Sequence, residues 1–294
     1  MAFADMSIFE EVFRGVMDGW KNEPETNDYI GDDGFLHCGV CGEAKEAPMP
    51  PEIMELFPDR KVRPRMCRCM VERAEKEEKE AAEQQKKLQI DNLRAFGLYD
   101  PLYELSRFDK DDGRQARAMV AAKNYVENFS EFYEEDIGLM LWGGVGTGKS
   151  FIAACIANAL IDKFTSVIMS SVQDLVAEIT AEFGEKREYV LGHIKNVDLL
   201  ILDDLGVERD TAYMLEHVYD IVNARYKAKK PMLVTTNLSP AQMSEEKEFS
   251  KKRIYARVIE MCQPIKVDGE SRRRGIARDK AERAKKLLGF GDES

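Results

Sequence analysis

The sequence contains no long apolar run. No stretch of its 294 residues approaches the roughly 18 apolar residues that a membrane-spanning helix needs. The first residues, from Met1 to Glu11, lack the basic-then-apolar pattern of a secretion signal. A hydrophobic content of 44% and a charged content of 33% are typical of a soluble globular protein of one or two domains. We therefore expect a cytoplasmic protein with no membrane partner.

Positive charge is scarce except near the C-terminus. The chain has a net charge of −11, although the segment from Lys251 to Lys286 is strongly basic. An acidic body with a basic C-terminal segment could repel DNA overall and still bind it locally. The alternative is that this segment is only a solvated basic helix.

Cysteine is rare, with six residues in the chain, but four of them lie within one short region. They form a Cys-x-x-Cys pair and a tighter Cys-x-Cys pair: Cys38, Cys41, Cys67 and Cys69. Disulfides are unusual in the cytoplasm, so clustered pairs favour a closed structural Zn²⁺ site that stabilises a fold and carries no chemistry. His37 could replace one of the cysteines. Reduced free thiols and a redox pair are the alternatives.

Three regions are predicted from these patterns. Residues 1–70 form a small zinc-binding N-terminal domain, which includes an apolar helical stripe between Ile8 and Trp20. Residues 71–95 form a charged helical linker, because this stretch has strong helix formers and almost no apolar stripe. Residues 96–294 form a second domain, whose first helix is predicted over 115–132. The aromatic-rich stretch 96–108 is predicted to be a loop.

The second domain contains a phosphate-binding loop. The motif G-x-x-x-x-G-K-[ST] is matched at every fixed position by Gly143, Gly144, Val145, Gly146, Thr147, Gly148, Lys149 and Ser150. An apolar run precedes the motif, and a helical sequence beginning at Phe151 follows it. Strand, glycine loop and helix together predict that Lys149 reaches the β- and γ-phosphates of a nucleotide and that Ser150 binds Mg²⁺.

Two more strands are predicted to end in polar side chains. The apolar run from Leu199 to Leu202 ends in Asp203 and Asp204, and the run from Pro231 ends in Asn237. The carboxyl ends of parallel strands form the ligand-binding edge of an α/β sheet. We expect Asp203 to hold Mg²⁺ through water and Asp204 to orient or deprotonate the attacking water.

The last predicted strand spans residues 264–267, and the helix before it, 249–262, carries two arginines on one face. Arg253 and Arg257 are four residues apart. An arginine that reaches a neighbouring subunit's γ-phosphate could stabilise the transition state. The alternative is an ordinary surface arginine.

Several stretches resemble the DnaC/DnaI-type replicative helicase loaders and their relative IstB, which are AAA+ ATPases. The matching stretches are 141–150, 199–208, 221–226, 235–238 and 253–258. This resemblance implies an α/β AAA+ fold with a five-stranded parallel sheet and no helical lid domain. It also implies ATP, Mg²⁺ and Zn²⁺ as cofactors, and self-association through ATP at subunit interfaces.

The same resemblance assigns residues and partners. It implies that Asn237 is the sensor-1 residue, that Arg257 is the arginine finger with Arg253 second, and that one arginine near Arg272 approaches the nucleotide. Because Arg273 and Arg274 follow Arg272 directly, the sequence does not decide which of the three corresponds to the family's arginine. It further implies that the N-terminal domain grips the hexameric DNA helicase while the ATPase domain contacts single-stranded DNA.

Other functions are compatible with the same motifs. A transposition helper of the IstB type shares the ATPase core but recruits a transposase, and the cysteine module and charged linker argue against it. A phosphate-loop enzyme acting on a small metabolite would need an acceptor pocket and a lid, for which no segment is a candidate. A nucleotide-gated adaptor that scarcely hydrolyses ATP is a further alternative.

Overall fold

The computed structural model of the chain describes residues 24–55, 58–59, 61–181, 185–207, 211–269 and 271–288. The apolar stripe predicted between Ile8 and Trp20 lies outside these residues. The chain divides into two compact units, Met1–Lys86 and Lys87–Ser294. Within the part that is described, no helix is both long and apolar enough to cross a lipid bilayer.

Two short hairpins make up most of the first unit. β1 (Tyr29–Ile30) pairs antiparallel with β2 (Leu36–His37), and β3 (Glu46–Pro48) pairs antiparallel with β4 (Val62–Pro64). A single helical turn, α2 (Pro51–Met54), follows β3. The described part of this unit buries few apolar side chains, so it has little hydrophobic core of its own there.

A buried ion pair holds the first hairpin to the loop that follows it. The Lys45 ammonium lies 2.6 Å from a carboxylate oxygen of Asp28, and both side chains are almost fully buried. The other oxygen of Asp28 accepts a hydrogen bond of 3.1 Å from the backbone N–H of Gly39. Opposite charge keeps the pKa of Asp28 low, with the hydrogen bond from Lys45 as the main cause. This pair therefore fixes the loop that carries Cys38 and Cys41.

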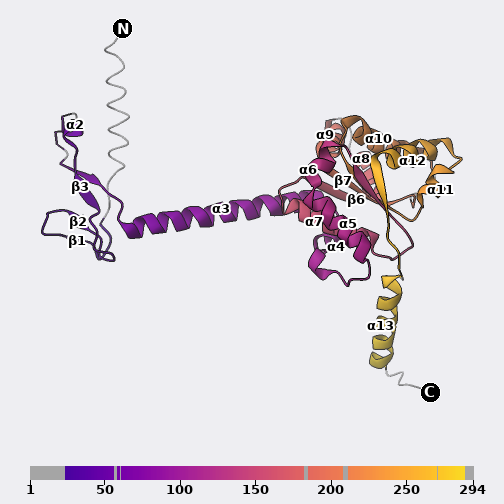
Figure 1. Cartoon of the computed structure of the whole chain (residues 1–294), viewed down its shortest axis with the longest axis horizontal. Coiled ribbons are helices and arrows are strands. Elements are labelled where there is room, and N and C mark those ends of the chain that lie inside the picture. Colours follow the sequence, from indigo (N-terminus) through magenta and orange to yellow (C-terminus); the bar gives the residue numbers. More distant parts are fainter. Residues whose placement is uncertain are drawn as a thin grey trace, which may run out of the picture. The chain divides into compact units, whose positions relative to one another are not determined.

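The charged linker forms one uninterrupted helix (Figure 1), which confirms the helical prediction. α3 spans Arg68–Gly97, so it begins earlier and ends later than the predicted 71–95. Its 30 residues correspond to about 45 Å of helix. Every residue from Val71 to Gln89 is exposed, in keeping with the absence of an apolar stripe. α3 ends at Gly97, where a Cβ atom would lie 1.9 Å from the carbonyl oxygen of Val167.

The second unit is built on a five-stranded parallel sheet. The strands are β5 (Gly138–Trp142), β6 (Val167–Ser171), β7 (Leu199–Leu205), β8 (Met232–Thr236) and β9 (Cys262–Lys266). Their spatial order is β6-β7-β8-β5-β9, and every pair is parallel. The predicted fold class is thus confirmed. The last strand begins two residues earlier than the predicted 264–267.

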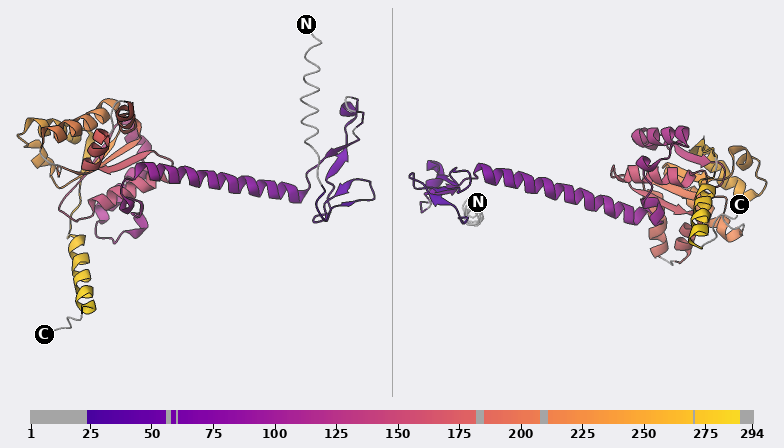
Figure 2. Two further views of the ribbon diagram at one scale, coloured as in Figure 1. Left: turned by 180° about the vertical axis from the view of Figure 1, so that it is seen from behind. Right: turned by 90° about the horizontal axis from the view of Figure 1, so that it is seen from below.

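Helices cover both faces of this sheet (Figure 2). Alternate strand residues point to opposite faces, so Leu139 and Leu141 pack with helices α5 and α7, while Met140 packs with α8 to α12 on the other face. The helices are α5 (Ala116–Glu127), α6 (Phe129–Glu134), α7 (Lys149–Ile161), α8 (Val172–Ala181), α9 (Glu185–Asn196), α10 (Ala212–Ala228), α11 (Pro240–Ser244) and α12 (Phe249–Met261). Burying both faces explains why the strands are almost continuously apolar.

Two sequence predictions are corrected here. Residues 115–132 do not form one helix, because α5 ends before Asn128, whose side-chain amide donates to the carbonyl of Asn124 and competes with the helical pattern. The stretch 96–108 is not only a loop: it contains the end of α3, the turn α4 (Pro101–Glu104) and the beginning of a 3-10 turn, η1 (Phe108–Lys110).

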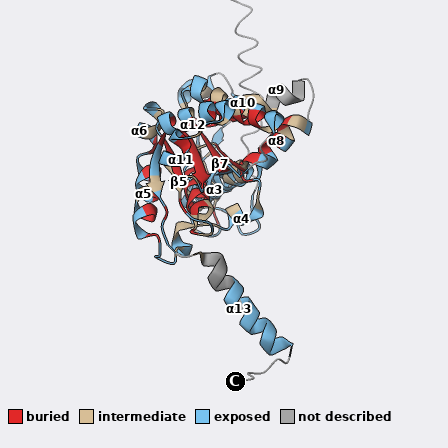
Figure 3. Cartoon of the chain, turned by 90° about the vertical axis from the view of Figure 1, so that its right-hand side faces the viewer, coloured by how far each residue is buried: buried red, intermediate tan, exposed pale blue. Residues whose placement is uncertain are grey.

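The last part of the basic C-terminal segment forms α13 (Arg272–Leu287), which is exposed wherever its side chains are described (Figure 3). After β9, the described residues contain this helix and no other. In that part of the chain there is no helical lid domain, as the resemblance implies.

Candidate nucleotide and metal sites

The phosphate-binding loop connects strand β5 to the helix α7. Gly143 has a φ of +152° and Gly146 a φ of +80°, while Gly148 is left-handed and forms the N-cap of α7. A Cβ atom at Gly143 would lie 2.3 Å from the carbonyl oxygen of Val267. Because Gly148 has no side chain that caps α7, the amide donors of the first turn are those that a phosphate group binds.

Lys149 sits at the centre of this loop. Its side chain is buried, and its ammonium donates to the carbonyls of Gly143 at 3.1 Å and Gly144 at 2.8 Å. It also donates to the side-chain oxygen of Asn237 at 2.8 Å. Asn237 comes from the loop after β8, so the structure brings together the lysine and the polar amide that the sequence placed at the same sheet edge.

The two acidic residues after β7 have different environments. Asp203 is buried, and one of its oxygens accepts a 2.5 Å hydrogen bond from the Thr235 hydroxyl. Asp204 is exposed with a φ of +58°, and its backbone N–H donates to the Thr235 hydroxyl at 2.9 Å. The register between β7 and β8 shifts between Leu202 and Leu205. This irregularity places the two neighbouring carboxylates in different surroundings.

A pocket of about 390 Å³ lies at this edge of the sheet, a size suited to a small ligand. Its walls come from the loop, the start of α7 and the ends of β7 and β8: Val145, Gly146, Gly148, Lys149, Ser150, Phe151, Asp204, Val207 and Asn237. Gly143, Gly144, Thr147 and Asp203 are not among the lining residues. The donors of the loop and the Asp204 carboxylate in this pocket fit a magnesium-bound nucleotide.

The predicted finger arginines lie on α12 and are not among the residues that line this pocket. The Arg253 guanidinium lies 4.2 Å from the ring centroid of Tyr219, and that of Arg257 lies 4.5 Å from the same ring. Arg257 also lies 5.3 Å from the ring of Tyr226, and its Nη1 atom is buried with no hydrogen-bond partner among the described residues. The structure thus groups the two arginines on tyrosines of α10.

Arg272 begins α13, and its side chain and those of Arg273 and Arg274 lie outside the described side chains. The residue before it, Ser271, lies beside the phosphate-binding loop: a Cβ atom at Gly146 would be 2.2 Å from the Ser271 hydroxyl. The chain therefore brings the start of the basic helix to the nucleotide loop.

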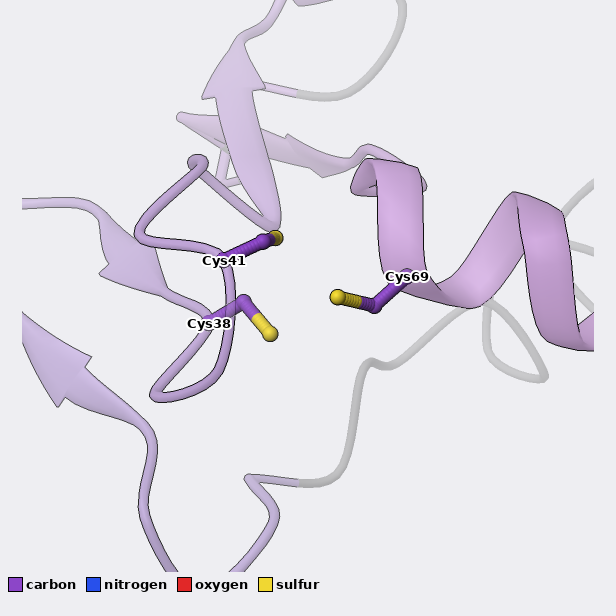
Figure 4. A group of neighbouring side chains, drawn as sticks. All are labelled: Cys38, Cys41 and Cys69. Atoms are coloured by element: carbon purple, nitrogen blue, oxygen red, sulfur yellow. The ribbon is translucent and has the colours of Figure 1, made fainter.

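Three of the four predicted thiols come together in the first unit (Figure 4). The sulfur atoms of Cys38, Cys41 and Cys69 lie within 4.8 Å of one another. Cys38 and Cys41 come from the loop after β2, and Cys69 comes from the first turn of α3. Backbone hydrogen bonds from Glu43 and Cys69 lower the pKa of Cys41 to about 6. Such a thiol is a good metal ligand, because zinc binds thiolates.

Two residues near these thiols, Cys67 and His37, are candidates for the fourth ligand of the predicted zinc site. Cys67 is not in the group of three, but it is fully buried, and its thiol interacts with those of Cys38 and Cys41. Burial is the main cause that raises its pKa. Both ring nitrogens of His37 already have partners, Nδ1 at 3.0 Å from the Gly42 carbonyl and Nε2 at 3.0 Å from Asp33. Of these two residues, Cys67 is therefore the better candidate for the predicted fourth ligand.

Comparisons with known proteins identify the family. The family model described as "IstB-like ATP binding protein" matches residues 70–281, which is well over half of the chain. This chain belongs to the IstB-like ATP-binding family. It is also 30% identical over 168 residues to the replicative helicase loader DnaI of Bacillus subtilis, covering 52% of this chain and 54% of DnaI.

A second relative of this IstB-like chain is the replicative helicase loader DnaC of Escherichia coli, 32% identical over 135 residues, covering 45% of this chain and 54% of DnaC. The chain spans about half the length of these curated relatives. A crystal structure of DnaI is also similar, at 26% identity and a TM-score of 0.49, over 60% of this chain and 94% of that one.

Sequence reasoning missed two tyrosines around the IstB-like site. The Tyr103 hydroxyl donates a 3.0 Å hydrogen bond to Asp203, and the ring of Tyr219 contacts both arginines that were predicted as fingers. Tyr103 is visible in the sequence only as one member of an aromatic stretch, and Tyr219 only as part of a helix. No local motif connects either tyrosine with its partner, which is 100 residues away for Tyr103.

Proposed function

We propose that this chain is an ATP-hydrolysing loader that places a replicative DNA helicase on single-stranded DNA. It is supported by a group of side chains suited to nucleotide binding at one sheet edge, in a chain similar to proteins named replicative helicase loaders. The family supplies the ATP-binding part of this proposal. Hydrolysis, the helicase and the DNA are our inferences.

The nucleotide roles follow from the placement of the side chains. Mg²⁺·ATP supplies a γ-phosphoryl group whose transfer to water releases energy for a change of state. Lys149 exchanges its contacts with loop carbonyls for phosphate oxygens, and Ser150 and Asp203 hold the Mg²⁺ ion. Asp204, at the pocket wall, orients or deprotonates water. Asn237 reports on the position of Lys149 because the two are hydrogen-bonded.

A neighbouring copy completes the site. Arg253 and Arg257 do not line their own pocket, so a finger role requires that they act on another copy of the chain. An arginine that approaches the γ-phosphate stabilises the charge of the transition state. Under this proposal ATP is bound between copies, and self-association and hydrolysis are coupled.

The remaining parts of the chain would bind the partners. The first unit, with Zn²⁺ held by Cys38, Cys41, Cys69 and Cys67, docks on the hexameric helicase, and α3 joins it to the ATPase unit. The exposed basic helix α13 gives the ATPase unit a surface that can bind the phosphates of single-stranded DNA.

The decisive experiment measures the ATPase rate of the full chain alone, with single-stranded DNA, and with DNA plus a hexameric replicative helicase. We expect stimulation by DNA and a stable complex with the helicase. A chain that is stimulated by neither and forms no complex is not a loader. Lys149→Ala, measured in parallel, shows how much of the rate belongs to this site.

The family match favours one second candidate, a transposition helper, because the matching model is named for IstB. Such a helper would bind duplex DNA more tightly than single strands and form no complex with the helicase. Fluorescence anisotropy with matched single- and double-stranded oligonucleotides separates the two functions.

A further inference from the structure

The segment between the linker helix and the first helix of the second unit touches the magnesium ligand. The Tyr103 hydroxyl donates to one oxygen of Asp203 at 3.0 Å, and the Thr235 hydroxyl donates to the other at 2.5 Å. Asp203 is buried, so its orientation is set by these two hydroxyl groups. Thr235 belongs to β8, the neighbouring strand, whereas Tyr103 belongs to the turn α4 outside the sheet.

A side chain of α7 holds the backbone of Tyr103 in place. Asn158 of α7 is fully buried, and its side-chain amide donates to the carbonyl of Tyr103 at 2.7 Å and to that of Ser106 at 2.9 Å. The side-chain oxygen of Asn158 accepts from Arg94, in the last turns of α3, at 3.2 Å. Arg94 also pairs with Asp162 at the end of α7. One buried amide thus connects the linker helix to the turn that carries Tyr103.

The same segment is fixed at the edge of the sheet. Leu98 forms a parallel bridge with Met169 of β6, and the backbone N–H of Tyr99 donates to the Met169 carbonyl at 3.2 Å. Arg107 pairs with Asp162 at 3.1 Å. The segment from Leu98 to Arg107 is therefore a built part of the second unit and does not merely connect two regions.

In its contact with Asp203, the Tyr103 hydroxyl is the hydrogen-bond donor. An oxygen of a carboxylate has two lone pairs and can accept from a hydroxyl while it also binds a metal-bound water. Partners of metal-ligating carboxylates fix their orientation, and their loss commonly weakens metal binding 10- to 100-fold.

We propose that Tyr103 is a positioning residue for the magnesium ligand Asp203, and that the chain Arg94–Asn158–Tyr103–Asp203 connects the linker helix to the Mg²⁺ ion. The inference rests on the proposed function only in taking Asp203 as a ligand of Mg²⁺. Its consequence is that binding of Mg²⁺·nucleotide stabilises the segment 98–107, and that this segment in turn strengthens Mg²⁺ binding.

The test is a Mg²⁺ titration of the full chain with a fluorescent ATP analogue, for wild type and Tyr103→Phe. Phenylalanine keeps the ring and removes only the donor. We expect the Mg²⁺ concentration at half-saturation to rise about tenfold, while the affinity for the nucleotide in EDTA stays the same. An unchanged or lower half-saturation overturns the proposal, the lower value because it would mean that Tyr103 holds Asp203 away from the ion.

Tyr99→Phe is the matched control. Tyr99 lies in the same segment, and its hydroxyl faces a different carboxylate, that of Glu178. We expect this variant to titrate like the wild type. An equal loss in both variants would assign the effect to packing of the segment and overturn the positioning role.

Amide hydrogen exchange tests the connection to the linker. Adding Mg²⁺ and a slowly hydrolysed ATP analogue should slow exchange in residues 98–107 of the wild type, and the slowing should be lost in Tyr103→Phe. Equal slowing in both proteins contradicts the connection. Neither measurement uses a helicase or DNA. Both would therefore still test the role of Tyr103 if the proposed loader function were wrong.

Discussion

Two adjacent glycines of the phosphate-binding loop have different backbone requirements. Gly143 has a φ of +152°, and a Cβ atom there would lie 2.3 Å from the Val267 carbonyl oxygen. At Gly144 a Cβ atom would meet only the methyl group of Thr147, at 3.6 Å. The motif fixes glycine at position 143 and leaves position 144 free, and the structure agrees, because only the first has a close backbone approach.

We therefore predict that Gly143→Ala destabilises the full chain by about 2–4 kcal/mol, since it combines backbone strain with a steric clash. A loss of this size lowers the melting temperature by several degrees. Gly144→Ala should leave it within about 1 °C, because an alanine tolerated by the backbone costs little. Differential scanning fluorimetry without nucleotide measures both variants, and equal melting temperatures would contradict this account.

At the scale of the element, one arginine binds backbone carbonyls at the end of a helix and at the start of two strands. Arg225 of α10 is fully buried and donates to the backbone carbonyls of Ile194, Val197, Asp198 and Pro231, among others. Desolvation lowers its pKa to about 10, so it remains charged at neutral pH. It satisfies the carbonyls that follow α9 and precede β8.

Arg225→Lys should destabilise the protein by about 2–4 kcal/mol, because a single ammonium cannot reach carbonyls that a guanidinium fork spans, and buried acceptors are left unpaired. Lys227→Met, an exposed neighbour on the same helix, should change stability by less than about 0.5 kcal/mol. Urea unfolding followed by circular dichroism provides the comparison. A similar loss in both variants would refute the capping role.

The arginines of α12 give a second prediction at this scale. Arg257→Ala should preserve nucleotide binding and remove most DNA-stimulated hydrolysis, because we propose that this arginine acts on a neighbour's γ-phosphate. Mixing Arg257→Ala with Lys149→Ala should restore part of the rate, since each variant supplies what the other lacks. Unchanged turnover in Arg257→Ala, or no recovery on mixing, would count against action between copies.

The elements themselves were largely predictable, and the connections between them were not. The strands are short apolar runs, and the motifs at 143–150 and 203–204 by themselves predict binding of a nucleotide and Mg²⁺. The break at Asn128, the length of α3 and the partners Tyr103 and Tyr219 depend on contacts between distant residues. Hydrophobic periodicity and composition report only the local preference for helix or strand. They therefore could not show which hydroxyl group reaches Asp203.

At the scale of the whole molecule, the two units have different sources of stability. The second unit has two continuous hydrophobic clusters, one on each face of its sheet. The described part of the first unit buries only a few apolar side chains and one ion pair, next to the thiol cluster. A small unit of this kind commonly depends on a metal or another cross-link.

We predict that the purified chain contains one zinc ion and that a strong chelator unfolds the first unit alone. Calorimetry should then lose one transition while nucleotide binding by the second unit is retained. Cys38→Ser and Cys67→Ser should lose the zinc measured by mass spectrometry, whereas Cys155→Ala should keep it. If Cys67→Ser retains zinc with undiminished affinity, the metal has only three cysteine ligands.

The strand order of the sheet has a consequence for synthesis on the ribosome. β5 lies between β8 and β9 and pairs with both, although they follow it by roughly 90 to 120 residues of chain. Translation at about 5–20 residues per second leaves β5 without either neighbour for several seconds or longer. The phosphate-binding loop, which follows β5 directly, therefore cannot take its final form until nearly the whole chain has been made. A nascent chain released before Lys266 would have no ability to bind nucleotide, however complete its motif.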